Sequence, residues 1–199
     1  TLVWDSGAAV ATGEDGVLTV HPGTDTLTYN GTTVSGNVYV EDGRTYVPLR
    51  TTVQLLGGDA QWDPYLDGAA VTTAEAKHDA VDLYWLSRII SAESRGEPME
   101  GQIAVGNVVL NRVASKTFPD TIPTVVFDRQ YAVQFEPVSN GTVYDTPAAS
   151  SVEAARRVLN GEKTVEGALY FYAPALSPGN WIVSNRTYLT TIGCHRFFL

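Results

Sequence analysis

Hydrophobic positions follow two different spacings along the chain, and the change comes near residue 80. Up to about Thr73, short runs alternate apolar and polar residues, which is typical of half-buried strands. Turn signals such as Asn30-Gly31 and Asp42-Gly43 separate these runs. The pattern predicts strands at Thr1–Trp4, Val17–Val20, Thr26–Tyr29, Val38–Val40 and Thr45–Val47, and a short helix at Pro48–Leu56. The first part of the chain is therefore expected to be rich in β-structure.

In the second part, apolar residues recur three and four positions apart, which places them on one face of a helix. The pattern predicts helices at Val81–Arg95, from Pro98 or Met99 to about Ser115, at Thr124–Asp128 and at Ala148–Asn160. Strand character returns at Ala168–Tyr172, Trp181–Val183, Tyr188–Ile192 and His195–Phe198. The predicted fold class is α+β: a small β-rich N-terminal module, then a mainly α domain with a small C-terminal β element.

The domain boundary is expected where the spacing changes. Residues 75–80 belong to a stretch without an apolar stripe and are interpreted as a linker between a module at 1–74 and a domain at 81–199. Inside the module, Trp4–Thr12 resembles Trp62–Thr73, which suggests a repeated unit, with the chain starting inside the preceding repeat. Trp4 and Trp62 are expected to be core residues.

Composition narrows the class of partner. The formal net charge of -9 argues against nucleic acid and against an anionic membrane surface, but it allows a sugar polymer. No apolar run is long enough to span a bilayer. Cys194 is the only cysteine, so no internal disulfide can form. His21 and His78 have no companion at ligand spacing, and we expect no metal site and no cofactor.

The stretch Ser91–Pro98 carries the first candidate chemistry. It follows the apolar helix pattern, and Gly96 and Pro98 predict the end of that helix. Glu93 is therefore expected in the last turn, where the negative end of the helix dipole and burial both raise the pKa of a carboxyl group. A carboxylic acid that stays protonated near neutral pH is what cleavage of a glycosidic bond requires. The alternative is an ordinary solvated glutamate.

Two family resemblances cover most of the chain. Val40–Arg50, followed by Leu55–Gly58 and Trp62-Asp63, resembles the copper amine oxidase N-terminal-like domain, or stalk domain, common in exported proteins of Gram-positive bacteria. That resemblance covers roughly residues 1–74, and we see no metal site in it.

The second resemblance rests on several motifs in order. They are Glu93–Pro98, Gly101–Val105, Val109–Val113, Phe118-Pro119, Gln134-Phe135, Pro137-Val138, Gly141, Ala168–Tyr172 and Ile192–Phe197. Together they resemble the SleB/CwlJ-type cell-wall hydrolase family, which includes spore-cortex-lytic enzymes, over about residues 82–198. The resemblance implies a lysozyme-like fold acting on peptidoglycan, with one essential glutamate that maps onto Glu93. The sequence departs from the family at Ser94, commonly alanine, and at Cys194, often asparagine.

A glycan cleft needs aromatic faces and hydrogen-bonding groups. The candidate substrate-binding residues are Gln134, Phe135, Tyr170, Tyr172 and Trp181, together with His195 from a family motif. Tyr170 and Tyr172 share one side of a predicted strand, and that side faces either the core or the cleft.

Other polar residues have competing interpretations. Glu97 is the nearest second carboxylate; it either has an accessory role, caps the next helix, or pairs with Arg95 or Arg112. Ser94 is a possible accessory residue. Glu136 is expected on the surface, and Asn111 and Arg112 are expected to make structural hydrogen bonds.

The predicted function is cleavage of peptidoglycan glycan strands at the muramic acid–glucosamine linkage. A single well-placed acid favours lytic transglycosylation, in which the muramic acid C6 hydroxyl attacks and yields a 1,6-anhydro product. The alternatives are a hydrolytic muramidase with the same acid and an inactive wall-binding protein. We expect a monomer that contacts glycan strands and not nucleic acid, and that is secreted or associated with the cell wall or spore. The substrate is either spore cortex or vegetative wall.

Overall fold

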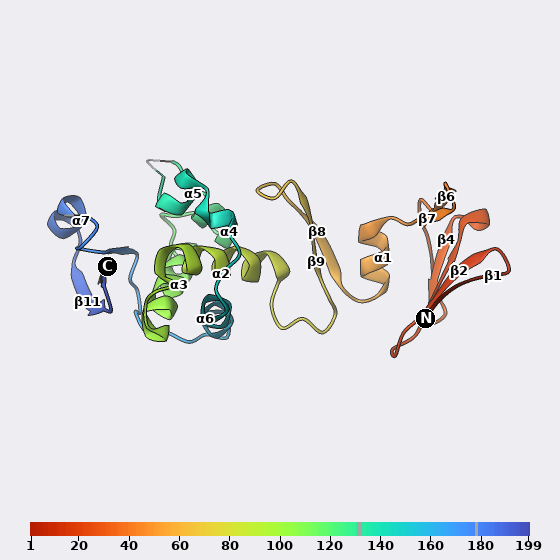
Figure 1. The fold of residues 1–199 in the computed structure, drawn as a ribbon, viewed down its shortest axis with the longest axis horizontal. Coiled ribbons are helices and arrows are strands. Elements are labelled where there is room, and N and C mark those ends of the chain that lie inside the picture. The colour runs from red at the N-terminus through yellow and green to blue at the C-terminus, as the bar shows by residue number, and fades with distance from the viewer. Residues whose placement is uncertain (131–132, 178) are drawn as a thin grey trace. The chain divides into compact units, whose positions relative to one another are not determined.

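A computed structural model describes residues 1–130, 133–177 and 179–199. The chain divides into two compact units, Thr1–Lys77 and His78–Leu199. Figure 1 shows the elements of both units. Among the described residues, no helix combines the length and the apolar character needed to cross a membrane.

The N-terminal unit is built on a five-stranded antiparallel sheet in the order β1-β2-β3-β4-β5. Its strands are β1 (Leu2–Asp5), β2 (Ala8–Thr12), β3 (Val17–His21), β4 (Thr26–Tyr29) and β5 (Thr32–Ser35), with a 3₁₀ turn at Pro22–Thr24. Cross-strand partners place Val20 opposite Leu27, and Leu27 opposite Val34, on one face. Val38 packs on this face, and Leu55 joins from the helix that follows. The alternating pattern therefore produces the core of this unit.

Two hairpins and a helix complete the unit: β6 (Tyr39–Glu41) with β7 (Arg44–Tyr46), α1 (Leu49–Leu55), and β8 (Asp59–Asp63) with β9 (Gly68–Thr72). The predicted strands and the predicted short helix are present within one or two residues. The strands β2, β5, β8 and β9 were not predicted, because the alanines of β2, β8 and β9 and the exposed threonines of β5 give a weak strand signal.

The two similar stretches Trp4–Thr12 and Trp62–Thr73 correspond to two hairpins, β1–β2 and β8–β9. Trp4 lies opposite Ala9, and Trp62 lies opposite Ala69. Both tryptophans are 58% exposed, so the prediction that they are core residues was wrong. The reason is position: Trp4 is on an edge strand, and Trp62 is in a two-stranded sheet, whereas the core forms over the central strands.

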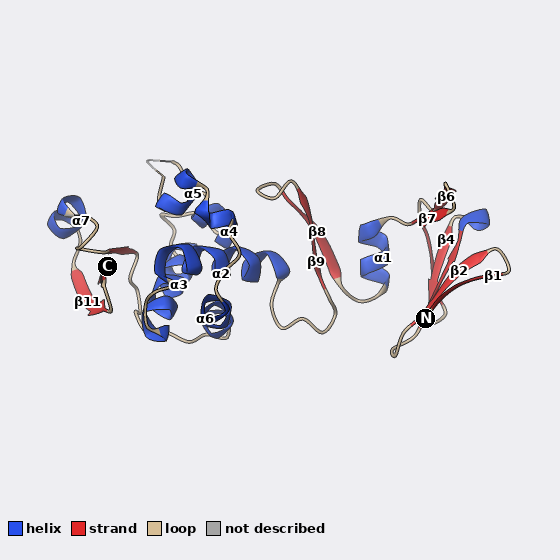
Figure 2. Ribbon diagram, in the orientation of Figure 1, coloured by secondary structure: helices blue, strands red, loops and turns tan. Residues whose placement is uncertain are grey.

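The C-terminal unit is helical, with a small sheet at its end (Figure 2). Its helices are α2 (Ala80–Ser94), α3 (Met99–Val113), α4 (Ile122–Val126), α5 (Glu136–Asn140), α6 (Ala149–Leu159) and α7 (Asn180–Asn185), with a 3₁₀ turn at Thr142–Tyr144. The strands β10 (Tyr170–Tyr172), β11 (Tyr188–Ile192) and β12 (His195–Phe198) form an antiparallel sheet with β12 in the middle. This is the predicted α+β arrangement.

Helices α2, α3 and α6 contact one another and enclose the core of the unit (Figure 1). Trp85, Leu86, Ile89 and Ile90 of α2 are fully buried, as the apolar spacing predicted. Gly106 of α3 lies where these helices meet, and a Cβ there would come within 2.8 Å of Ile90 and 2.9 Å of Val158. A side chain at this position would therefore push the helices apart.

Two local predictions in this unit failed. The expected strand at Trp181–Val183 lies inside helix α7, where the Asn185 side chain donates a hydrogen bond to the carbonyl of Trp181. A run of three apolar residues fits either a strand or a helical turn, so the spacing alone could not decide. Helix α5 was missed because it is only five residues long.

Candidate active site

Glu93 lies in the last turn of α2 and lines a cavity of about 370 Å³. The cavity walls come from the end of α2, the last turn of α3, the segment around α5, the end of β10 and the start of β12. The fully buried face of α2 anchors the helix, so Glu93 is held on a rigid element. Tertiary packing thus brings distant segments around the residue that the sequence singled out.

Burial raises the pKa of Glu93 from 4.5 to about 7. The negative charge of Glu136 adds to the increase, and the positive charge of Arg112 opposes it. A shift of this size disfavours the ionised form by roughly 3 kcal/mol. Burial was one of the two expected causes, beside the helix dipole. Near neutral pH a large fraction of Glu93 therefore carries the proton that a general acid needs.

Glu136 was expected on the surface, and its side chain is exposed, but it also lines the cavity. It lies in the first turn of α5. Sequence analysis did not connect it with Glu93, because the two residues come from elements far apart in the chain. The acidic residue directly after the Gln134-Phe135 motif was the only available signal.

Arg112 lies at the end of α3, is 4% exposed and also lines the cavity. Its Nε donates a hydrogen bond of 2.8 Å to the carbonyl of Leu169, which confirms the structural role expected from the sequence. Its Nη1, however, is buried and has no hydrogen-bond partner among the described residues. Burial lowers the pKa of Arg112 to about 10, so it stays charged at neutral pH. Arg112 therefore offers a free N–H group beside Glu93.

Asn111, which precedes Arg112 in the sequence, has a structural role. The Asn111 amide donates to the carbonyls of Val165 and Ala168 at 3.1 and 2.9 Å, as expected. It thereby ties α3 to the segment that leads into β10.

Four of the predicted substrate-binding residues line the cavity: Gln134, Phe135, Tyr172 and His195. Phe135 is only 2% exposed, with its ring 5.1 Å from the Arg112 guanidinium, so it supports the cavity wall and offers little free face for stacking. His195 is buried, and burial lowers its pKa although Glu97 opposes this. The imidazole is therefore mostly neutral at pH 7.

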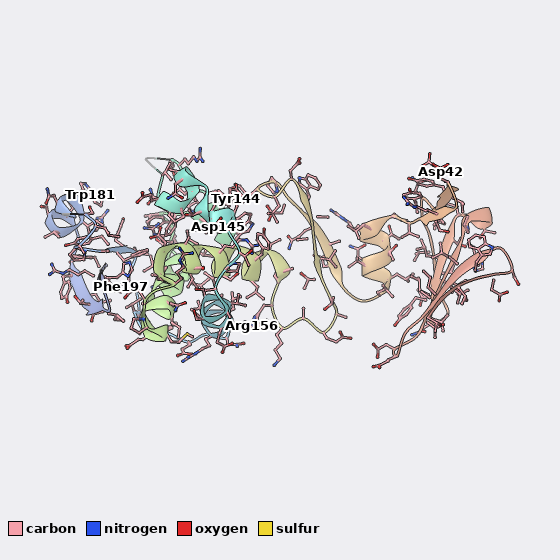
Figure 3. The ribbon with its side chains drawn as sticks, viewed as in Figure 1. Asp42, Tyr144, Asp145, Arg156, Trp181 and Phe197 are labelled. Atoms are coloured by element: carbon pink, nitrogen blue, oxygen red, sulfur yellow. The ribbon has the colours of Figure 1, made fainter. Side chains whose placement is uncertain are left out.

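Tyr170 and Trp181 are not among the residues that line the cavity. The Tyr170 hydroxyl accepts a hydrogen bond from Arg186, and its ring centroid lies 6.0 Å from that of Trp181. Trp181 is 57% exposed on α7 (Figure 3). These two residues form an aromatic cluster outside the cavity, because α7 carries Trp181 away from it.

Glu97 and Ser94 have local contacts. The Ser94 hydroxyl is buried and donates to the carbonyl of Ile90. Glu97 accepts a hydrogen bond of 2.8 Å from the backbone N–H of Cys194, and its Oε2 lies 4.0 Å from His195 Nδ1. Of the alternatives for Glu97, pairing with Arg95 or Arg112 is not observed, since no such ion pair exists among residues 1–130, 133–177 and 179–199. Glu97 instead connects the start of α3 to the turn before His195.

A metal site would need several ligating side chains close together in the described part of the chain. No cluster of three or more His, Cys, Asp or Glu side chains has a suitable arrangement there.

The Cell Wall Hydrolase family model matches residues 96–198, just over half of the chain. This chain belongs to the cell wall hydrolase family. The match begins three residues after Glu93, at the point where α2 has ended. The copper amine oxidase N-terminal domain model matches residues 1–65 and 28–107. Both family resemblances seen in the sequence are thereby confirmed.

Two curated relatives of this chain are named spore cortex-lytic enzymes. The chain is 36% identical to a spore cortex-lytic enzyme of Halalkalibacterium halodurans over 63% of this chain and 37% of the relative. A spore cortex-lytic enzyme of Bacillus cereus is 34% identical over 71% of this chain and 52% of the relative. The chain thus spans about half or less of the length of these curated relatives.

A solved structure shares the fold of the C-terminal unit. The catalytic domain of the germination-specific lytic transglycosylase SleB from Bacillus anthracis matches with a TM-score of 0.56 and 34% identity. The match covers 62% of this chain and 98% of that domain. The cell wall hydrolase fold predicted from the sequence is therefore present.

Proposed function

We propose that this chain cleaves the glycan strands of bacterial peptidoglycan at the muramic acid–glucosamine linkage, with Glu93 as the catalytic acid. The observation that carries the proposal is a carboxyl group with a pKa of about 7 in a cavity beside a buried arginine. Such a group donates a proton at neutral pH, which departure of the sugar oxygen requires.

The reaction is a lytic transglycosylation. Glu93 protonates the glycosidic oxygen as the bond to C1 of muramic acid breaks. The resulting carboxylate then removes the proton of the muramic acid C6 hydroxyl, whose oxygen bonds to C1 and closes a 1,6-anhydro ring. Glu93 regains its proton in this step, so the cycle needs neither a water nucleophile nor a second acid.

Other cavity residues bind and orient the sugar. The free Nη1 of Arg112 donates to a carbonyl oxygen of the substrate, such as that of an N-acetyl or lactyl group. Gln134, Tyr172 and neutral His195 supply further polar contacts. Phe135 holds the cavity wall and the Arg112 side chain in place.

The names of the relatives point to a class of substrate. Two relatives are spore cortex-lytic enzymes, and the similar solved structure is the catalytic domain of a germination-specific lytic transglycosylase. We therefore propose spore cortex as the substrate, and a location in the cell wall or spore after secretion. The N-terminal unit is proposed to be a stalk module that spaces or anchors the catalytic unit.

One observation favours a second candidate, the hydrolytic muramidase. Glu136 shares the cavity with Glu93, and glycoside hydrolysis uses two carboxyl groups separated by about 5–5.5 Å or 6.5–9.5 Å. In that reaction Glu136 would activate water or act as the nucleophile. The product would then end in reducible muramic acid, whereas an anhydro end cannot be reduced.

Mass spectrometry of fragments released from purified cortex tests both candidates. We expect 1,6-anhydromuramic ends that resist borohydride reduction, and a loss of at least about 100-fold in rate for Glu93→Gln, because general acid catalysis contributes about 10²–10⁴-fold. The amide fills the same volume, so circular dichroism should be unchanged. Reducible ends would favour hydrolysis. A Glu93→Gln chain that cleaves at a rate within about tenfold of the unmodified chain would show that Glu93 is not the catalytic acid.

A further inference from the structure

A second, smaller hollow of about 230 Å³ lies next to the cavity of Glu93. Arg88, Ser91 and Ala92 of α2 and its C-cap residue Arg95 form one wall; their spacing of three, one and three places them on one face of the helix. Residues 140, 142, 145 and 146 form the other wall. We call this hollow the arginine pocket.

The arginine pocket adjoins the catalytic cavity. Ala92, Asn140 and Thr142 line both. With a rise of about 1.5 Å per helical residue, Arg88 and Arg95 lie roughly 7.5 and 3 Å from Glu93 along the axis of α2. A group attached to a sugar that occupies the cavity can therefore reach the adjoining pocket.

The arginines of the pocket have unused bonding capacity. The Arg88 guanidinium stacks on the Tyr84 ring at 3.5 Å, and its Nε is buried without a hydrogen-bond partner. Neither Arg88 nor Arg95 forms an ion pair in the described part of the chain. Asp145 is the one acidic side chain among the lining residues, so the pocket carries net positive charge in a protein whose formal charge is -9.

These features match the chemistry of a carboxylate. A guanidinium stacked on an aromatic ring can still donate from its N–H edge to a planar acceptor, and the fork of N–H groups matches the geometry of a carboxylate. In peptidoglycan, carboxylates occur on the peptide attached to the lactyl group of muramic acid. Two extended residues of such a peptide span about 7 Å, which is enough to bridge from the cavity to the pocket.

We propose that the arginine pocket binds a carboxylate of the peptide side chain on the glycan strand. The inference rests on the proposed function, because it assumes that a muramic acid residue occupies the cavity of Glu93. The pocket then gives the chain a preference for strands that carry peptides over strands without them. Arg88 and Arg95 are specificity residues in this proposal, and they take no part in breaking the bond.

Binding to the Glu93→Gln chain tests the proposal without cleavage. The ligands are soluble glycan fragments with intact peptides, and the same fragments after an amidase has removed the peptides. The amidase leaves a carboxylate on the lactyl group itself, which lacks the two extended residues, about 7 Å, that the reach to the pocket requires. We expect the peptide-bearing fragments to bind about tenfold more tightly by calorimetry, with the ratio falling as salt rises. Adding Arg88→Gln and Arg95→Gln should bring the ratio close to one.

The matched control is Arg156→Gln. Arg156 is exposed in the last turn of α6 and lines neither hollow, and Figure 3 shows it well apart from Asp145. This variant should keep the tenfold ratio. Arg88→Lys with Arg95→Lys should keep part of it, because the charge remains while the planar fork is lost.

Three outcomes would overturn the proposal. They are equal affinity of the Glu93→Gln chain for both ligands, an unchanged ratio in the double glutamine variant, and an equal loss of the ratio in Arg156→Gln. If the double variant does not fold, the single variant Arg95→Gln replaces it, because Arg95 is exposed. An unchanged ratio of the two affinities in Arg95→Gln would then contradict the proposal. A chain that binds peptide-bearing fragments preferentially but cleaves nothing would instead contradict the proposed function alone.

Discussion

At the scale of single residues, one anionic and one cationic side chain of the cavity, Glu136 and Arg112, have opposing effects on the pKa of Glu93. Burial is the largest cause of its raised pKa, Glu136 raises the pKa further, and Arg112 lowers it. The acid is active only while protonated, so activity should fall as the pH rises through about 7. Glu136 therefore extends the range of pH over which Glu93 can donate its proton.

Removing the charge of Glu136 tests this balance. In Glu136→Gln the pKa of Glu93 should decrease, because the neighbouring negative charge no longer disfavours ionisation. The alkaline limb of the pH profile of kcat/KM should then move to lower pH, with the maximal rate within about tenfold of the unmodified chain. Rates of fragment release between pH 5 and 9 give the profile.

Glu153→Gln is the control, since Glu153 is exposed on α6 and does not line the cavity. Its profile should be unchanged. If the alkaline limb of the Glu136→Gln profile stays at the same pH or moves to higher pH, Glu136 does not raise the pKa of Glu93. A loss of several orders of magnitude at every pH would instead identify Glu136 as a nucleophile or base, and hence favour hydrolysis.

At the scale of elements, the turn between β11 and β12 is attached to the start of α3. Gly193 has φ +56°, and Glu97 occupies the space where a Cβ of residue 193 would lie. The next residue, Cys194, donates its N–H to Glu97, and His195 follows at the cavity wall. The absence of a side chain at Gly193 therefore allows the sheet to approach α3 and sets the position of His195.

Gly193→Ala should destabilise the C-terminal unit for two reasons. A left-handed backbone costs a residue with a Cβ about 1–2 kcal/mol, and the new methyl group also overlaps the Glu97 carboxylate. Gly161→Ala provides the comparison, because Gly161 has φ +93° but open space around its Cβ position. Thermal unfolding should show a decrease in Tm for Gly193→Ala at least twice that for Gly161→Ala. Equal decreases would mean that Glu97 moves aside freely.

At the scale of the whole molecule, each unit has its own core. Val20, Leu27 and Val38 form that of the first, and the buried faces of α2, α3 and α6 form that of the second. The cavity of Glu93 is lined only by residues of the second unit. We therefore propose that the module at 1–74 folds separately and is not needed for the chemistry, with a linker at 75–80 and the catalytic domain at 81–199.

Two shortened chains test this proposal. A chain that starts at Lys77 keeps Asp79, whose side chain caps α2 by accepting from the N–H groups of Val81 and Asp82. It should fold and cleave soluble glycan fragments at about the rate of the full chain. A chain that starts at Val81 lacks the cap and should be less stable by about 1 kcal/mol in urea unfolding. A Lys77 chain that is folded but inert would show that the first unit contributes to the site.

The sequence by itself determined the elements whose signal is local. The long helices, most strands and the position of Glu93 at the end of a buried helix follow from apolar spacing and from Gly96 and Pro98. These features depend on neighbours within one or two helical turns, so a single stretch of chain contains the information. The burial that raises the pKa of Glu93 could be anticipated for the same reason.

Only the tertiary structure decided which distant residues meet. Glu136 and Arg112 join Glu93 because α5 and α3 pack around the end of α2, and Glu97 pairs with the backbone of Cys194 because β12 reaches the start of α3. Trp4 and Trp62 are exposed, and helix α7 removes Trp181 from the cavity. Such contacts join segments far apart in the chain, and their geometry is set by the packing of the core, which local spacing does not encode.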